Sequence, residues 1–310
     1  MSEKRATRAA YGPTLVELVQ EGLDVVAVDA DLSGSTTTAV LGKSYPERLF
    51  NVGVAEQNMI GVAAGLALSG KIAFSGSFAV FGTGRAYDQI RNTVCYAQLD
   101  VKVAPSHAGI SVGADGGSHQ MLEDIALMRV LPNMRVLVPA DYVAASAALH
   151  IAAHTSGPFY VRLGRAATGP VYSDRSSVRL GRANVLRSGN DVSLIACGAE
   201  VEQALAAAEM LEGAGVSAEV IDAFSLKPLD DETILDSVSK TGWAVSCEEH
   251  SIIGGLGAAV AELLAAHPGI ARRGQRFIGV ADCFGTSGQI DELFAKFRLD
   301  ARSIYDVVVN

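Results

Sequence analysis

NVGVAEQNM, residues 51–59, leads from a short apolar segment into a long helical run of small residues, VAEQNMIGVAAGLALSG (54–70). Glu56 therefore lies in the first turn of the expected helix, shortly after Gly53. Acidic side chains are favourable at the positive end of a helix dipole, so this position alone has a purely structural explanation. The segments that follow give Glu56 a second, functional interpretation.

Two glycine-rich loops follow Glu56 along the chain. SGSFAVFGTGRAYDQ (75–89) and SHAGISVGADGGSHQ (106–120) each begin where a short apolar run ends, and they carry aromatic, histidine and aspartate residues. In an α/β sheet, the loops after neighbouring strands meet at the carboxyl edge and form the binding site there. Together with the segment before Glu56, these loops predict a site at such an edge.

The chain alternates short runs rich in β-branched residues with helical runs over most of its 310 residues. This alternation predicts an α/β fold of two domains, each a mostly parallel sheet with helices on both faces. Residues 164–190 interrupt the pattern and are rich in Gly, Ser, Arg and Pro. We therefore place one domain at residues 1–170, a linker at 171–190 and a second domain at 191–310.

The individual elements follow from the period of the apolar residues. The expected helices cover residues 6–22, 54–70, 84–96, 119–131, 141–154, 200–215, 230–242 and 254–267. The expected strands lie within residues 23–36, 48–54, 71–78, 100–109, 134–140, 158–165, 191–198, 216–226, 243–250 and 276–284.

Composition excludes several classes of function. The net charge is −9 and the Lys and Arg residues are scattered, which argues against nucleic acid or an anionic membrane as the main partner. No run reaches the roughly 18 apolar residues of a membrane span, and the start, MSEKRATRAAYG, lacks the apolar core of a signal peptide. The cysteines have neither metal-ligand nor disulfide spacing, so we expect reduced core residues of a cytoplasmic protein at Cys95, Cys197, Cys247 and Cys283.

The glycines of GGLGAAVAEL (254–263) resemble a dinucleotide-binding turn because they follow a strand and precede a helix. The full G-x-G-x-x-G pattern is missing, and no convincing acidic residue follows about 20 residues later. We interpret these glycines as a tight turn with close packing of the helix on the sheet.

His107 and His119 are the strongest candidates for chemistry. His107 directly follows an expected strand, and His119 lies just past GADGGS, where a helix is expected to begin. A histidine exposed to a cleft at a strand end can transfer protons near neutral pH, and Asp115 lies between the two in sequence. The other histidines have ordinary helix or loop-edge settings and receive no functional role: His150, His154, His250 and His267.

Four further residues are weaker candidates when taken singly. Asp29 and Asp31 end the first expected strand, where an aspartate is often a cap or turn residue. Phe78 and Phe81 flank a glycine-rich loop, but two aromatic residues at this spacing are more often part of a core. From the residues alone, the site is that of an α/β enzyme with an acid and histidines at a sheet edge.

Five segments together resemble the transketolase family of thiamine diphosphate enzymes. They occur in the family's order and span essentially the whole chain: RLFNVGVAEQNM (48–59), GSFAVF (76–81), SHAGISVGADGGSHQ (106–120), LPNMRVLVPAD (131–141) and LGR (163–165). The resemblance implies a pyrimidine-binding domain followed by the family's carboxy-terminal domain.

The resemblance also implies roles in binding the cofactor, thiamine diphosphate. Glu56 corresponds to the glutamate that hydrogen-bonds a ring nitrogen of the aminopyrimidine and so promotes formation of the ylid. Phe78 and Phe81 correspond to the aromatic pocket around that ring, and Asp31 to an acid near the cofactor. The protein orients the cofactor, which itself serves as the electron sink.

Roles toward the substrate follow in the same way. His107 and Asp115 correspond to positions that contact the hydroxyl groups of a ketose donor. His119 corresponds to a histidine near the reacting carbonyl, where it could transfer a proton or stabilise an oxyanion. Arg165 corresponds to a basic residue that binds the sugar phosphate, with Arg162 as the nearby alternative.

A full-length transketolase has an amino-terminal domain with a GDG motif and a later Asn, which hold Mg²⁺ and the diphosphate. GADGG (113–117) is a different loop, and we find neither that spacing nor a phosphate-binding P-loop. The chain thus resembles the smaller subunit of a split transketolase, contributing no Mg²⁺ ligand itself and expected to form an α2β2 heterotetramer with a diphosphate-binding subunit. Its substrates would be sugar phosphates.

Three alternatives remain. Deoxyxylulose phosphate synthase shares AEQ, RAYDQ and the GADG-x-x-HQ loop, but usually has an Asp-Arg pair where this chain has Ser106 and His107. The beta subunit of a 2-oxoacid dehydrogenase has a similar build, but residues 106–120 fit it poorly. A regulatory scaffold that kept the fold would be favoured by loss of Glu56 or of both histidines, and all three are present.

Overall fold

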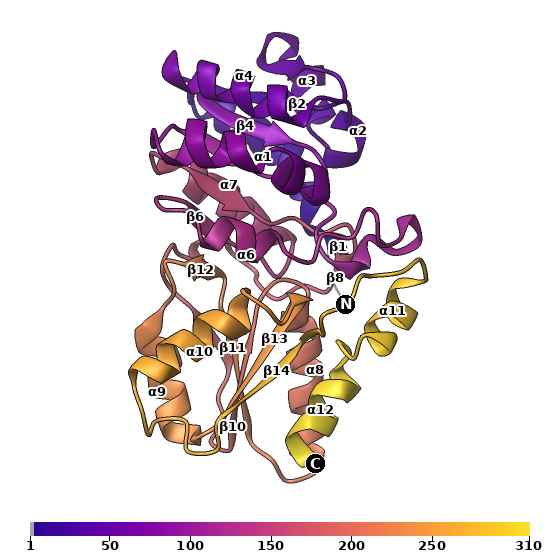
Figure 1. The fold of residues 1–310 in the computed structure, drawn as a ribbon, viewed down its shortest axis with the longest axis vertical. Helices are drawn as coiled ribbons and strands as arrows, with labels where there is room; N and C mark the ends of the chain where they lie inside the picture. Colours follow the sequence, from indigo (N-terminus) through magenta and orange to yellow (C-terminus); the bar gives the residue numbers. More distant parts are fainter. Residues whose placement is uncertain (1–2) are drawn as a thin grey trace.

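The computed structural model describes residues 3–310 and shows two α/β units stacked along the long axis of the molecule (Figure 1). The first contains a seven-stranded sheet in the order β12-β6-β7-β5-β4-β2-β3. Neighbouring strands are parallel except for β12, which runs antiparallel to β6. The strands are β2 (Val25–Asp29), β3 (Leu49–Asn51), β4 (Ile72–Gly76), β5 (Val101–Val103), β6 (Arg135–Leu137), β7 (Phe159–Val161) and β12 (Ser225–Lys227).

The second unit contains a five-stranded sheet in the order β14-β13-β10-β11-β9. Only β9 is antiparallel to its neighbour. A short ribbon of β1 (Arg5–Ala6) and β8 (Ala167–Thr168) lies where the two units meet (Figure 1). The strands of the second sheet are β9 (Asn184–Arg187), β10 (Val192–Ala196), β11 (Ala218–Asp222), β13 (Ala244–Ser251) and β14 (Gln275–Val280).

Helices cover both faces of each sheet, as the sequence predicts. In the first unit α1 (Tyr11–Gln20) and α7 (Tyr142–His154) pack on one face, and α4 (Glu56–Leu68) and α6 (Asp124–Arg129) on the other. In the second unit α8 (Glu200–Gly213) and α12 (Ala301–Val309) pack on one face, and α9 (Asp231–Thr241) and α10 (Leu256–Ala266) on the other. The remaining α-helices are α2 (Ser33–Thr36), α3 (Ala39–Ser44), α5 (Tyr87–Gln89) and α11 (Ile290–Lys296).

Strand β2 shows why the sheet is covered on both sides. Its side chains alternate, so Val25 and Ala27 join the core under α1, whereas Val26 and Val28 join the core under α4. A central parallel strand buried on both faces must be apolar throughout, and this explains the continuous run VVAV.

Several predicted boundaries are wrong. The helix expected at 119–131 begins only at Asp124, because residues 116–119 form a turn in which Gly116 has φ +76°. The helix expected at 84–96 is replaced by two wide π-helical segments, η3 (Val80–Arg85) and η4 (Ile90–Cys95), on either side of α5. Glycines within the first segment weaken an ordinary helix.

Two predicted strands are too long. Residues 216–226 divide between the sheets: β11 belongs to the second, whereas β12 pairs with β6 of the first. The strand expected at 276–284 ends at Val280, and a loop follows that reaches the first unit. Tertiary pairing decides both outcomes, because apolar residues continue beyond the point where each segment leaves its sheet.

Three cysteines are buried as expected, but Cys283 is exposed, because it lies in the loop after β14 rather than in a strand. In the part of the chain from residue 3 onward, no helix is both long and apolar enough to cross a membrane.

The glycines at 254–257 allow α10 to approach a buried carboxylate: Glu248 accepts hydrogen bonds from the N–H groups of Leu256 (2.7 Å) and Gly257 (2.8 Å). The first backbone N–H groups of α10 thus find their hydrogen-bond acceptor, the Glu248 carboxylate, within the protein.

Glu200 is a buried acid in the first turn of α8, and neither of its carboxylate oxygens has a hydrogen-bond partner within residues 3–310. Burial first, and then the charges of Glu249, Asp300 and Glu248, raise the pKa of Glu200 well above 4.5. At pH values between the pKa of Glu200 in the unfolded chain and its pKa in the folded chain, the folded state holds a proton that the unfolded state releases. The stability that the protonated Glu200 allows is therefore fully present below the unfolded pKa and is lost as the pH rises through the folded pKa.

We expect Glu200→Gln to stabilise the chain more at about pH 8 than at about pH 5. The difference should be about 1.4 kcal/mol for each pH unit of that interval that lies between the unfolded and folded pKa values of Glu200. Urea unfolding of both proteins at the two pH values is the measurement. Other buried acids, such as Asp222 with a pKa raised to about 7, affect both proteins equally. An unchanged difference between the proteins at the two pH values would contradict this prediction.

Candidate active site

The carboxyl ends of β2, β4 and β5 form the edge that the sequence predicts. β2 and β4 end in register, with Asp29 opposite Gly76. Beyond them the chain continues with an isolated parallel bridge between Phe78 and Ser106. This bridge brings Phe78, after β4, beside His107, after β5.

Glu56 is the first residue of α4 and is 1% exposed. The chain turns into the helix at Gly53, whose φ of +74° is readily adopted only by glycine. The Oε2 of Glu56 accepts a hydrogen bond of 2.8 Å from Nη1 of Arg85, an exposed residue at the end of η3. Its Oε1 has no hydrogen-bond partner among residues 3–310.

Aromatic rings surround the space next to this ion pair. The guanidinium of Arg85 lies 4.7 Å from the centre of the Phe81 ring, and Phe78 stacks on Phe81 at 6.1 Å between centroids. Phe78 also stacks on His107 at 3.8 Å, and His119 meets Phe81 edge-on at 5.3 Å. The structure thus brings Phe78, Phe81, His107 and His119 into one cluster that continues through Arg85 to Glu56.

His107 is buried rather than exposed to a cleft as the sequence suggested. Its Nδ1 lies 2.8 Å from Oγ of Ser106, and its Nε2 lies 3.4 Å from Nη1 of Arg8. Burial first, and then the positive charges of Arg8, Arg165 and His119, lower the pKa of His107 to about 3. His107 is therefore neutral near neutral pH and suits hydrogen bonding better than proton transfer.

His119 lies in a turn whose position depends on the second unit. Gln120 donates a hydrogen bond of 2.9 Å to the carbonyl of Thr286, in the loop after β14. A Cβ added to Gly285 would lie 1.8 Å from Oε1 of Gln120, and one added to Gly117 would lie 2.6 Å from the carbonyl oxygen of Gly285. The loop 285–288 thus fixes the backbone that carries His119.

Arg165 and Asp115 lie together at the rim. Their closest charged atoms are 3.8 Å apart, and Arg165 also donates to the carbonyl of Val112. The Arg165 side chain is 37% exposed. Arg162, by contrast, is buried and binds Asp124 through Nε (2.7 Å) and Nη2 (3.1 Å), so it is committed to the core.

Asp31 lies at the same sheet edge but on the side of β3. It accepts a hydrogen bond of 3.1 Å from Asn51, and its φ is +65°. Asp29 is fully buried and accepts hydrogen bonds from Leu32, Thr36 and Thr38. Asp29 therefore shapes the loop that carries Asp31.

Sequence reasoning missed Arg8, Arg85 and Gln120. Arg85 belongs to the RAYDQ segment, and Gln120 immediately follows His119, so proximity to the motifs could have drawn attention to both. Arg8 gives no such signal, because only the packing of the amino-terminal segment brings it to His107.

A buried carboxylate beside stacked rings suits a planar nitrogen heterocycle. The free oxygen of Glu56 can accept a hydrogen bond from a ring N–H, and the faces of Phe78 and Phe81 can pack against the ring plane. The residues present therefore fit an aminopyrimidine.

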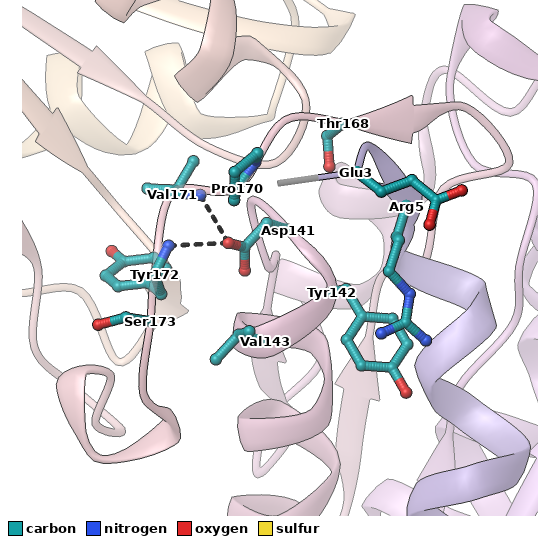
Figure 2. Close-up of a pocket in the computed structure, with 10 residues that line it drawn as sticks. All are labelled: Glu3, Arg5, Asp141, Tyr142, Val143, Thr168, Pro170, Val171, Tyr172 and Ser173. Carbon is teal, nitrogen blue, oxygen red and sulfur yellow. Dashed lines mark hydrogen bonds between the residues drawn. The ribbon is translucent and has the colours of Figure 1, made fainter. Parts of the chain in front are cut away.

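A separate cavity of about 440 Å³ lies at the start of α7 (Figure 2). Asp141 accepts hydrogen bonds there from the N–H groups of Val171 (2.7 Å) and Tyr172 (2.8 Å), and the Arg5 guanidinium lies 3.3 Å from the Tyr142 ring centre. None of the predicted site residues lines this cavity, so it is distinct from the sheet-edge site.

Comparison with known families identifies both units. Residues 3–170 match the pyrimidine binding domain of transketolase, and residues 181–304 match the transketolase C-terminal domain. The chain belongs to the transketolase family. This membership implies dependence on thiamine diphosphate.

Relatives of similar length are named as a putative transketolase section or as transketolase subunits. The chain is 48% identical over 302 residues to the putative transketolase C-terminal section of Methanocaldococcus jannaschii, covering 97% of this chain and 94% of that one. It is 43% identical to the 6-deoxy-6-sulfo-D-fructose transketolase subunit of a Clostridium species, covering 97% and 93%. It is 38% identical to an apulose-4-phosphate transketolase subunit of Phocaeicola vulgatus, covering 96% and 95%.

Solved structures give the same picture. A split-gene transketolase, described as an inactive beta4 tetramer, superposes with a TM-score of 0.89 at 48% identity, covering 99% of this chain and 97% of that one. The transketolase of Leishmania mexicana superposes with a TM-score of 0.83 at 27% identity, but this chain spans only 45% of it. The chain thus corresponds to the C-terminal section of a transketolase.

Proposed function

We propose that this chain is the small subunit of a split transketolase that transfers a two-carbon ketol unit from a ketose phosphate to an aldose phosphate. The observation that carries the proposal is the buried carboxylate of Glu56 beside the stacked rings of Phe78 and Phe81. The agreement in length with the C-terminal section from M. jannaschii supports the split arrangement.

Glu56 would hold the aminopyrimidine of thiamine diphosphate through its free carboxylate oxygen, and Phe78 and Phe81 would pack on the ring. When bound, the cofactor supplies a thiazolium carbanion that accepts the ketol unit. Arg85 orients the Glu56 carboxylate and balances its charge. Asp31, at the adjacent strand end, would face the cofactor from the other side of the site.

The remaining candidates would act on the sugar. His107, held neutral, would hydrogen-bond a donor hydroxyl group together with Asp115. His119, less buried and anchored by the turn before Gln120, would serve the reacting carbonyl as a proton donor or oxyanion partner. Arg165 would bind the phosphate with its planar guanidinium.

The diphosphate and Mg²⁺ would be held mainly by an amino-terminal transketolase subunit in an α2β2 assembly. The related beta4 tetramer, described as inactive, supports the need for such a partner. Two relatives are named for 6-deoxy-6-sulfo-D-fructose and for apulose 4-phosphate, so the donor is best found with a panel of sugars that includes both.

We expect the chain alone to bind thiamine diphosphate weakly and to show no turnover, and addition of the partner subunit to restore both. Calorimetry with cofactor and Mg²⁺, followed by a donor–acceptor screen on the mixture, is the test. Tight binding and turnover by the chain alone would disprove the need for a partner. No turnover of any sugar by the mixture would disprove the transferase activity.

A further inference from the structure

Three side chains from two helices converge at the surface, on the side of the first unit formed by α1 and α7. His150 and His154 lie one turn apart at the end of α7, and Glu21 caps the end of α1. Nδ1 of His150 lies 3.7 Å from Oε1 of Glu21, and Nε2 of His154 lies 3.7 Å from Oε2 of the same carboxylate. One ligand atom from each residue lies within 4.8 Å of the other two.

We propose that Glu21, His150 and His154 form a binding site for a divalent transition-metal ion of the zinc class. Imidazole and carboxylate are the ligands that zinc takes, at about 2.0–2.2 Å, which places neighbouring tetrahedral ligands roughly 3.3 Å apart. The observed separations, up to 4.8 Å with one ligand atom from each residue, reach this value by rotation of the exposed side chains of Glu21 and His154. Three protein ligands leave the fourth position to water.

The hydrogen bond of His154 already favours its metal-binding tautomer. Nδ1 of His154 lies 2.9 Å from the carbonyl oxygen of His150, which can only accept a hydrogen bond. Nδ1 therefore carries the proton, and the lone pair of Nε2 faces Glu21. Metal-bound histidines in general donate their second N–H to a carbonyl or carboxylate in this way.

His150 has a corresponding partner on its far side. In the metal-bound tautomer its Nε2–H would donate a hydrogen bond to Oε2 of Glu17, which lies 3.4 Å away, and Nδ1 would be free for the metal. Nη1 of Arg175 lies 2.5 Å from the same Nε2 and can only donate a hydrogen bond, so Nε2 accepts it in the metal-free chain and the neutral ring carries its proton on Nδ1. Metal binding at Nδ1 therefore moves that proton to Nε2 and moves the Arg175 side chain away from the ring, toward Glu17, which it already contacts at 2.7 Å.

The backbone adds a favourable field. Glu21 and His154 both stand at helix carboxyl ends, where unpaired carbonyl groups give a partial negative charge that attracts cations. A bound ion would join the ends of α1 and α7, which pack against each other on one face of the sheet.

Calorimetric titration of the full chain with Zn²⁺ tests the site, in a Cys283→Ser background because that thiol is exposed. We expect one equivalent to bind and the melting temperature to rise. His154→Ala should weaken binding by more than about 100-fold, and Glu17→Gln by about 10- to 100-fold. Co²⁺ should give the visible absorption of a four-coordinate site, and Mg²⁺ should not compete.

His267→Ala is the matched control. His267 is also an exposed histidine at a helix end whose Nδ1 lies 3.0 Å from the carbonyl oxygen four residues earlier, but it belongs to no such cluster within residues 3–310. Its removal should leave the titration unchanged. Absence of a one-equivalent event, or equal loss of affinity in His154→Ala and His267→Ala, would overturn the proposal.

Discussion

Glu56→Gln is expected to leave the chain folded and to lower turnover of the reconstituted enzyme by about 10²–10⁴-fold. Gln has nearly the same shape and can still accept the hydrogen bond from Arg85. It lacks the charge that favours protonation of the bound ring, so proton removal from the thiazolium carbon should slow by a similar factor. Steady-state kinetics and proton exchange at that carbon measure the two effects.

Arg85→Gln is the companion variant, because it removes the ion-pair partner of Glu56 but retains the carboxylate. Its effect should be smaller than that of Glu56→Gln, and the double variant should be no slower than Glu56→Gln alone, since both act through one group. Turnover of Glu56→Gln close to the parental rate would contradict a role in catalysis. Glu56 would then only stabilise the start of α4 through the helix dipole and form the ion pair with Arg85.

Arg165→Ala is expected to raise KM for phosphorylated sugars by about 10- to 150-fold, with a much smaller effect on unphosphorylated ones. A hydrogen bond to a charged group contributes about 1.5–3 kcal/mol, which corresponds to this factor. Arg165 is partly exposed, and its positive charge adds to the effect of burial in lowering the pKa of Arg8 and of His107. Since a phosphate is remote from the reacting carbon, kcat should change less than KM. Kinetics with matched pairs of sugars provide the measurement.

Arg165 also holds the backbone at Val112, so loosening of that loop must be separated from loss of a phosphate contact. Asp115→Asn is the control: it weakens the ion pair with Arg165 without removing the guanidinium, and it should not discriminate by the phosphate. Arg162→Ala cannot serve, because its loss would leave Asp124 buried without its cation. Equal losses for both kinds of sugar in Arg165→Ala would assign Arg165 a structural role.

The sequence by itself determined the α/β class and the position of Glu56 in the first turn of a helix. Both depend on short-range geometry: a period of two or 3.6 residues in the apolar pattern, and a glycine able to turn the chain at position 53. The placement of Phe78 and His107 after adjacent strands also followed, because parallel strands direct their carboxyl ends to one edge.

Only the tertiary structure decided how these residues are held. Arg85 reaches Glu56 across 29 positions, Arg8 reaches His107 across 99, and Gln120 reaches Thr286 across 166. The burial of His107 and its lowered pKa follow from those neighbours and not from its position after a strand. Hydrogen bonds and desolvation depend on which distant atoms come within a few ångströms, and no local pattern in the chain encodes that distance.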